Sequence, residues 1–180
     1  MTHHCHKHIP LCGPYGCVDD KIKAETMRTC DWAFTSKFSP PAEILSHPML
    51  SKIVQRMMLK VSGEQHTKFV LYSAHDSTVI PILEYLGIFS KQWVPYAMRV
   101  VFELWEAGGL VASKLEGDDM DKHFIRILVN GKDYTRKIRM CKDSLKFAKL
   151  CPLKSLLRVL EGSTENMGEQ YTKLCKTKQQ

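Results

Sequence analysis

The strongest limit on how this chain folds is an apolar run, a polar turn and an amphipathic segment in direct succession. Residues 68–73 read Lys-Phe-Val-Leu-Tyr-Ser, a short β-favouring run, and residues 74–78 interrupt it with Ala-His-Asp-Ser-Thr. Five apolar residues then recur at helical spacing: Val79, Ile80, Leu83, Leu86 and Ile88. Gly87 is suited to end this helix. This order predicts a strand, a turn and a helix, which together form a βα unit.

Three further helices are indicated. In the βα unit, Ser77 or Thr78 is placed to cap the helix, and Pro81 falls in or near its first turn, where proline costs least. A second helix is predicted with Pro48 in its first turn and Gly63 past its end. It carries an apolar stripe: Leu50, Ile53, Val54, Met57, Met58 and Val61. A short helix is predicted over residues 19–29. Pro152 opens the last one, whose apolar face ends at Gly162: Leu153, Leu156, Leu157 and Leu160.

Alternating residues predict strands in the second half of the chain. Residues 99–106 place Val101, Glu103 and Trp105 on one face, and residues 124–129 form another apolar run. Asn130-Gly131 follows and predicts a tight hairpin, because both central residues of a type I′ turn need positive φ. We expect the return strand over residues 132–138 and a loop over the acidic residues 116–121. Alternating helices and strands with one hairpin indicate a mixed α/β sandwich.

Composition narrows the class of protein. A chain of 180 residues with 44% apolar and 25% charged residues has enough apolar side chains for a core. No apolar run approaches the ~18 residues of a membrane span. The net charge is +7, and residues 132–158 hold nine basic and two acidic residues. That segment is either a solvated basic face or a surface for an anionic partner. Nucleic acid is not expected, because the basic residues are not interleaved with stacking aromatics.

The seven cysteines gather at the two ends of the chain: Cys5, Cys12, Cys17 and Cys30 near the start, and Cys141, Cys151 and Cys175 near the end. This clustering favours local disulfides of a secretory compartment, with one sulfur unpaired and the pairing open. The competing interpretation is a metal site in the first residues: His3, His4, Cys5, His6, His8 and Cys12. No C-x-x-C pair is present, so we expect neither a metal nor a cofactor.

The turn between the predicted strand and helix carries the chemistry. In open α/β sheets, ligands bind beyond the carboxyl ends of strands, where a helix N-terminus offers free N–H groups. His75 can donate hydrogen bonds to an anionic oxygen there, and Asp76 can carry a proton to a leaving group. The alternative is structural: an aspartate that caps the helix beside a packed histidine.

These residues carry a resemblance to a known family. Residues 72–79, Tyr-Ser-Ala-His-Asp-Ser-Thr-Val, resemble the second signature of the histidine acid phosphatases. Pro95-Tyr96-Ala97 with the strand that follows, and Cys151-Pro152-Leu153, are similar to later segments of that family. Residues 12–19, 102–105 and 129–133 look closest to its 2-phosphoxylose phosphatase branch. The likeness runs from about residue 5 to residue 175.

The resemblance implies a domain organisation. It implies a histidine-phosphatase-like αβα sandwich with a mixed sheet that is incomplete in this chain. Residues 21–175 would form the C-terminal half of the domain, after an irregular Cys- and His-rich loop over residues 1–20 and before a basic tail over residues 176–180. Cys141 and Cys151 would pair with each other, and Cys175 would bridge to the other half. The Golgi lumen or the cell exterior is the implied location.

The resemblance also implies an activity, phosphomonoester hydrolysis through a phosphohistidine. Asp76 matches the family's proton donor and His75 its phosphate-stabilising histidine. The family's nucleophile lies in an Arg-His-Gly segment, and no histidine of this sequence follows an arginine. We therefore expect the isolated chain to be inactive. The implied substrate is a phosphorylated small molecule or the xylose of a proteoglycan linker. The alternative is a non-catalytic module that binds polyanions such as glycosaminoglycans through the basic segment.

Overall fold

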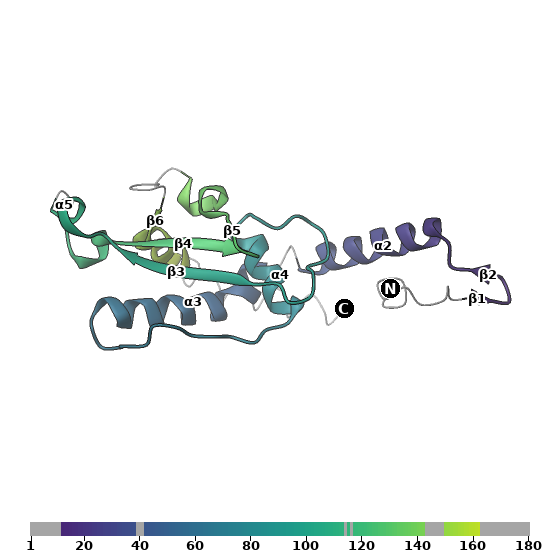
Figure 1. The fold of residues 1–180 in the computed structure, drawn as a ribbon, viewed down its shortest axis with the longest axis horizontal. Coiled ribbons are helices and arrows are strands. Elements are labelled where there is room, and N and C mark those ends of the chain that lie inside the picture. Colours follow the sequence, from purple (N-terminus) through teal and green to yellow (C-terminus); the bar gives the residue numbers. More distant parts are fainter. Residues whose placement is uncertain (1–11, 39–41, 114, 116, 143–149, 163–180) are drawn as a thin grey trace, which may run out of the picture.

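A four-stranded antiparallel sheet with helices on one face forms the body of the protein (Figure 1). The computed structural model describes residues 12–38, 42–113, 115, 117–142 and 150–162. Its helices are α2 (Asp20–Phe38), α3 (Ala42–Val61), α4 (Asp76–Tyr85), α5 (Gly109–Ala112) and one over residues 153–162. Its strands are β1 (Cys12–Gly13), β2 (Gly16–Cys17), β3 (Val100–Glu106), β4 (His123–Val129), β5 (Lys132–Asp133) and β6 (Cys151–Pro152). Short 3₁₀ turns are η1 (Asp119–Lys122), η2 (Thr135–Lys137) and η3 (Arg139–Cys141). The α/β class is confirmed, but every strand pair among the described residues is antiparallel, so the mixed sheet that the resemblance implies is not found there.

The predicted hairpin lies between β4 and β5. Asn130 and Gly131 have φ of 49° and 81°, the positive values that the turn requires. The return strand ends at Asp133 rather than at residue 138, because the chain then turns into η2 and η3. The Thr135 hydroxyl accepts the Ile127 N–H at 2.9 Å and holds this turn against β4.

The core lies between one face of the sheet and the helices. Phe102 pairs with Ile127 and Leu104 with Ile125, so these four side chains share the covered face. α3 and α4 contact each other extensively beneath them (Figure 1). The fully buried members of this cluster come from α3, the C-cap of α4, β4, the η2–η3 turns, β6 and the last helix: Leu50, Leu86, Ile125, Ile127, Ile138, Cys141, Cys151, Leu153 and Leu156. No described helix is long and apolar enough to cross a membrane.

α4 begins two or three residues earlier than the predicted caps place it. His75 occupies the N-cap position, whereas the sequence favoured Ser77 or Thr78. Pro81 is therefore the sixth residue of the helix, beyond the first turn. Gly87 ends the helix as predicted, with φ of 74°. The Gly87 and Ile88 N–H groups donate to the carbonyls of Glu84 and Leu83, the hydrogen-bond pair of a Schellman motif.

The position predicted for Pro48 is wrong. α3 begins at Ala42, which makes Pro48 its seventh residue and not part of its first turn. An interior proline costs about 3 kcal/mol, since it removes one helical hydrogen bond. The helix continues because three later side chains enter the core, each worth roughly 1.5–3 kcal/mol when fully buried: Leu50, Val54 and Met57.

The strand predicted over residues 68–73 is also absent. Residues 66–74 run back along α3 toward α4 (Figure 1) and make no backbone hydrogen bond to any described residue. Phe69 and Leu71 are each 78% exposed. Local preference for the β conformation is not enough, because a strand needs a neighbour to satisfy its N–H and C=O groups. The described residues supply no such neighbour, so this segment is an unpaired apolar edge.

An unpaired apolar edge favours self-association, which gives a first prediction. We expect the Phe69→Lys/Leu71→Lys variant to be monomeric, with a mass near 20.7 kDa, where the unchanged chain forms larger species. Light scattering coupled to size-exclusion chromatography measures this mass. The melting temperature should stay unchanged, because both side chains face solvent. Tyr15→Lys/Ile22→Lys, two exposed residues outside the edge, is the control. An equal shift in both variants would contradict a role for this edge.

The first described residues form a small hairpin and a projecting helix. β1 and β2 pair antiparallel and a disulfide joins Cys12 to Cys17, so this part of the predicted irregular loop is ordered. α2 runs to Phe38, well beyond the predicted end at residue 29, and projects from the sheet body (Figure 1). The Trp93 N–H donates to Asp31 at 2.7 Å and ties α2 to the loop before β3. Residues 1–11, with most of the predicted metal ligands, lie outside the described residues.

The acidic segment expected as a loop contains a 3₁₀ turn. η1 is held by a reciprocal capping box between Asp118 and Asp121. Lys154 of the last helix contacts both carboxylates, at 3.0 and 2.8 Å. Its hydrogen bond lowers the pKa of Asp118. Lys154 was counted in the basic segment of the sequence, and its charge is neutralised by these two carboxylates.

Candidate functional site

The His75–Asp76 turn lies where the extended segment, residues 66–74, leads into α4. His75 has extended backbone angles (φ −102°, ψ 169°), and its carbonyl accepts the N–H groups of Thr78 and Val79 at 3.0 Å each. Asp76 is the first residue of the helix, and its Oδ1 accepts the Ser77 N–H at 2.7 Å. The two side chains therefore come from adjacent positions at one helix N-terminus.

Neither the His75 nor the Asp76 side chain is fully buried. The structure leaves His75 exposed and Asp76 half-buried, and the His75 ring makes no capping hydrogen bond. The structural alternative, in which an aspartate N-cap lies beside a packed histidine, does not describe this turn, because His75 itself is the N-cap. An anion at this position would meet the positive end of the helix dipole with an imidazole and a carboxyl group beside it.

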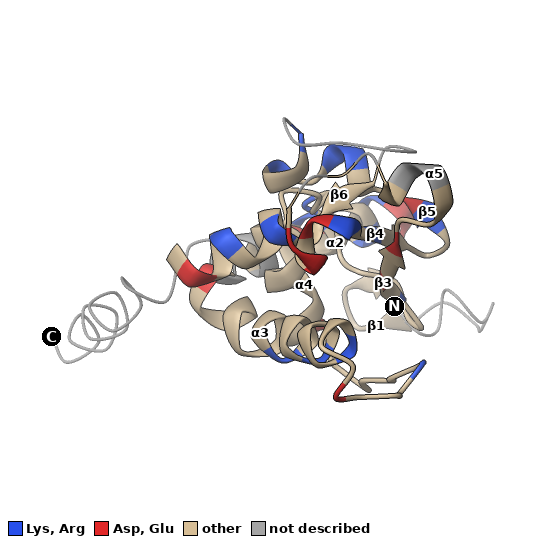
Figure 2. Cartoon of the chain, turned by 90° about the vertical axis from the view of Figure 1, so that its left-hand side faces the viewer, with Lys and Arg blue, Asp and Glu red and all other residues tan. Residues whose placement is uncertain are grey.

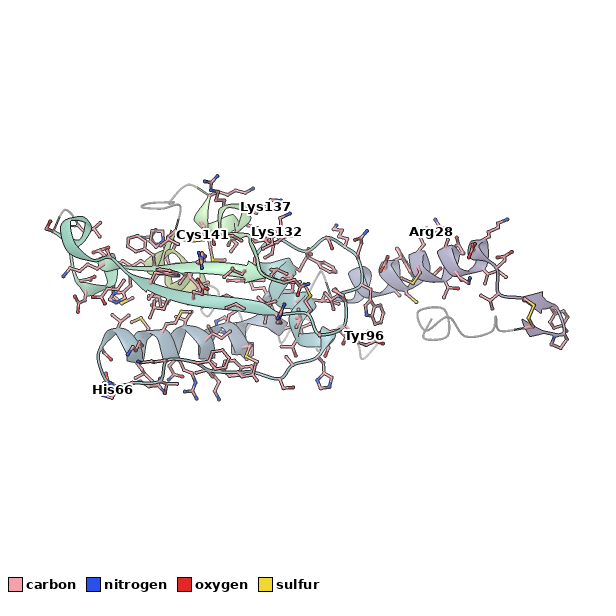
Figure 3. The ribbon with its side chains drawn as sticks, viewed as in Figure 1. Arg28, His66, Tyr96, Lys132, Lys137 and Cys141 are labelled. Atoms are coloured by element: carbon pink, nitrogen blue, oxygen red, sulfur yellow. A yellow bond between two sulfur atoms is a disulfide. The ribbon has the colours of Figure 1, made fainter. Side chains whose placement is uncertain are left out.

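The other described histidines are held elsewhere. His47 is buried in α3, where its ring lies 3.2 Å from the Ser51 hydroxyl and 3.3 Å from the Leu160 carbonyl. His123 places Nδ1 2.7 Å from the Asp119 carbonyl. His66 is exposed at the far end of the extended segment (Figure 3), roughly 30 Å of fully extended chain away from His75. Within the described residues, the structure thus brings no second histidine to Asp76.

The sequence did not single out one polar cluster on the open face of the sheet. Arg126 Nε donates to Glu103 Oε2 at 2.6 Å across the β3–β4 pair, and the Trp105 indole N–H donates to the same oxygen at 2.9 Å. The guanidinium lies 5.0 Å from the Trp105 ring centroid. Arg126 lowers the pKa of Glu103, and Glu103 raises that of Arg126. The sequence predicts two neighbouring strands here, but it does not fix their register. Only the register shows that Arg126 lies opposite Glu103.

The described cysteines form two disulfides and leave one free thiol. No group of three His, Cys, Asp or Glu side chains there is arranged to hold a metal ion. The structure joins Cys141 and Cys151 in a disulfide, the pair that the resemblance implies. Cys30 on α2 is a free thiol, and Cys175 lies outside the described residues.

The comparison with known proteins decides the family. The family model described as "Histidine phosphatase superfamily (branch 2)" matches residues 4–130, which include the whole His75–Asp76 turn. This chain is a member of that superfamily. The resemblance drawn from residues 72–79 is therefore confirmed.

Individual relatives of this histidine phosphatase superfamily member cover most of its length. It is 32% identical to 2-phosphoxylose phosphatase 1 of Xenopus tropicalis over 161 residues, 86% of this chain and 30% of that protein. It is 31% identical to the Homo sapiens 2-phosphoxylose phosphatase 1 over 89% of this chain and 33% of that protein. Lysophosphatidic acid phosphatase type 6 of Homo sapiens is 31% identical over 72% of this chain and 26% of that protein. The chain thus spans between about a quarter and a third of the length of these relatives.

Proposed function

We propose that this chain supplies the proton donor and one phosphate-binding side chain of a phosphomonoester hydrolase of the 2-phosphoxylose phosphatase type. The observation that carries the proposal is the placement of Asp76 and His75 together, accessible, at the N-terminus of α4. The family match includes this turn, and the relatives include phosphatases of two kinds.

In the first step, a histidine nitrogen outside this described site forms a bond to phosphorus as the bond from phosphorus to the alcohol oxygen breaks. The departing alkoxide is a strong base, so a positioned acid is needed. Asp76 gives its carboxyl proton to that oxygen. His75 donates to an equatorial phosphoryl oxygen, whose charge the helix N-terminus also stabilises.

In the second step, water attacks the phosphohistidine. The Asp76 carboxylate accepts the proton of that water as the nitrogen–phosphorus bond breaks, which releases inorganic phosphate and restores both groups. We propose a phosphorylated sugar, 2-phosphoxylose, as the substrate, because the relatives that cover 86% and 89% of this chain are named 2-phosphoxylose phosphatase. The two disulfides support a secretory location, the Golgi lumen or the cell exterior.

A replacement experiment tests this proposal. The segment of Xenopus tropicalis 2-phosphoxylose phosphatase 1 that matches this chain is exchanged for the chain itself, and p-nitrophenyl phosphate hydrolysis is measured. We expect the chimera to release phosphate steadily, and the isolated chain to release none above background because no histidine of its sequence follows an arginine.

Two outcomes would count against the proposal. A chimera that is folded by circular dichroism yet inactive would show that this turn does not serve the reaction. Steady hydrolysis by the isolated chain that falls in His75→Ala would show that the nucleophile lies within these 180 residues.

A further inference from the structure

The basic segment of the sequence separates into two parts in the structure. Lys154 turns away to the η1 carboxylates. Five cations remain exposed on β5, η2 and η3 and at the residue after them, and we call them the basic surface: Lys132, Arg136, Lys137, Arg139 and Lys142. Figure 2 shows Lys and Arg ribbon gathered above β6, and Figure 3 places Lys132 and Lys137 on one edge of the molecule near Cys141.

A rigid base holds the basic surface. Thr135, Ile138 and Cys141 point inward at every third position and are at most 1% exposed, as the three-residue period of successive 3₁₀ turns requires. The Arg139 N–H donates to the Leu86 carbonyl at 3.1 Å, and the Cys141 disulfide reaches β6. The intervening cations must therefore point outward, and little backbone entropy remains to be lost on binding.

The charges of the basic surface are not neutralised from within. None of its five cations forms an ion pair with a described acidic residue, unlike Lys23, Arg28, Lys122, Arg126 and Lys154. The amino groups of Lys132 and Lys137 lie 5.9 and 5.4 Å from the Tyr134 ring centroid. Asp133, the acid within this stretch, accepts the Thr135 N–H at 2.8 Å.

We propose that the basic surface binds a sulfated polysaccharide. Its five unneutralised cations complement a linear polyanion, and no large apolar side chain of residues 132–142 is exposed to anchor a protein partner or enter a membrane. Tyr134 is the one aromatic residue of residues 132–142, and two lysine amino groups lie over its ring, so this segment lacks the row of aromatic rings on which successive nucleic-acid bases stack.

The basic surface lies at the other end of α4 from His75. Arg139 contacts Gly87 just past the C-terminus of that helix, with Nε 3.5 Å from the position of an added Cβ. A ten-residue helix is about 15 Å long. The polysaccharide would therefore bind apart from the His75–Asp76 turn, and the inference stands without the proposed function.

Heparin binding by the full chain tests the inference. We expect Arg136→Gln/Lys137→Gln/Lys142→Gln to weaken binding of fluorescein-labelled heparin roughly tenfold in fluorescence anisotropy, because three charge contacts are lost. The slope of log affinity against log salt concentration should fall by about 2 to 3, since each neutralised anionic group releases close to one counterion. The control Lys21→Gln/Lys52→Gln/Lys60→Gln removes the same charge from α2 and α3 and should bind like the unchanged chain.

Equal weakening in both triple variants would overturn the inference, since net charge alone would then explain binding. It would also fail if oligothymidylate of matched charge or phosphatidylserine vesicles bound as tightly as heparin. Acetylation of the unmutated chain gives a second measurement: heparin should protect Lys132, Lys137 and Lys142 but not Lys52 or Lys60, and uniform protection would contradict a local site. Asp76→Asn should bind heparin unchanged, which separates this result from failure of the proposed phosphatase.

Discussion

Asp76→Asn in the chimeric phosphatase is expected to slow hydrolysis of glycerol 2-phosphate about 10²- to 10⁴-fold, the range of general acid catalysis. Asparagine keeps the size of the side chain and can still accept the Ser77 N–H, so α4 should begin at the same residue. It cannot donate a carboxyl proton. Hydrolysis of p-nitrophenyl phosphate should fall far less, because p-nitrophenolate leaves without protonation. Single-turnover rates of the two esters measure the difference.

His75→Ala should give a different pattern. A side chain that stabilises the phosphoryl oxygens acts equally on both esters, so both rates should fall by one common factor of about 10² to 10³. Asp119→Asn, which removes an exposed carboxylate of η1, is the matched control and should change neither rate. If Asp76→Asn slowed hydrolysis of the two esters equally, Asp76 would not be the proton donor. Its role would then be structural or electrostatic.

Short-range features could be predicted from the sequence. Asn130-Gly131 specified the hairpin because positive φ at both residues is cheap for this pair. Gly87 specified the end of α4 for the same reason. The apolar spacing of Leu50, Val54 and Met57 identified the buried face of α3 correctly. In each case the deciding interaction lies within a few residues of the pattern that indicates it.

Features that depend on distant partners could not be predicted in this way. Residues 68–73 have a strand composition, yet pairing requires a neighbouring strand, and no described segment lies beside them to pair. Pro48 indicated a helix start, but the burial of later α3 side chains outweighs the cost of an interior proline. The Cys12–Cys17 bond was one of several pairings left open, because cysteine spacing alone does not fix connectivity.

The candidate site shows the same division. The residue types and order of His75 and Asp76 were sufficient to mark a turn before a helix, and the structure keeps that turn accessible. The division of the basic segment was not foreseeable, because Lys154 faces η1 carboxylates more than thirty residues earlier in the chain. Which cations remain unneutralised is a property of the packed last helix rather than of the local sequence.

Removal of the Cys141–Cys151 disulfide by Cys141→Ala/Cys151→Ala is expected to lower the free energy of unfolding by about 3 kcal/mol. The bond closes a loop with a sequence separation of 10, and both cysteines are fully buried in the core cluster. It joins η3 to β6, which pairs with β4 through Cys151 and Ile125. The melting temperature should fall by roughly 6 to 12 °C, as measured by calorimetry.

Cys12→Ala/Cys17→Ala is the matched control for this prediction. It removes one disulfide as well, but that bond closes an exposed hairpin whose residues take no part in the core clusters. Because the hairpin can open without disturbing the sheet, the melting temperature should change little. The Cys141→Ala/Cys151→Ala variant should also bind heparin more weakly, since η3 loses the covalent link that fixes the base of the basic surface. Equal melting temperatures in the two double variants would show that the buried bond does not stabilise the core.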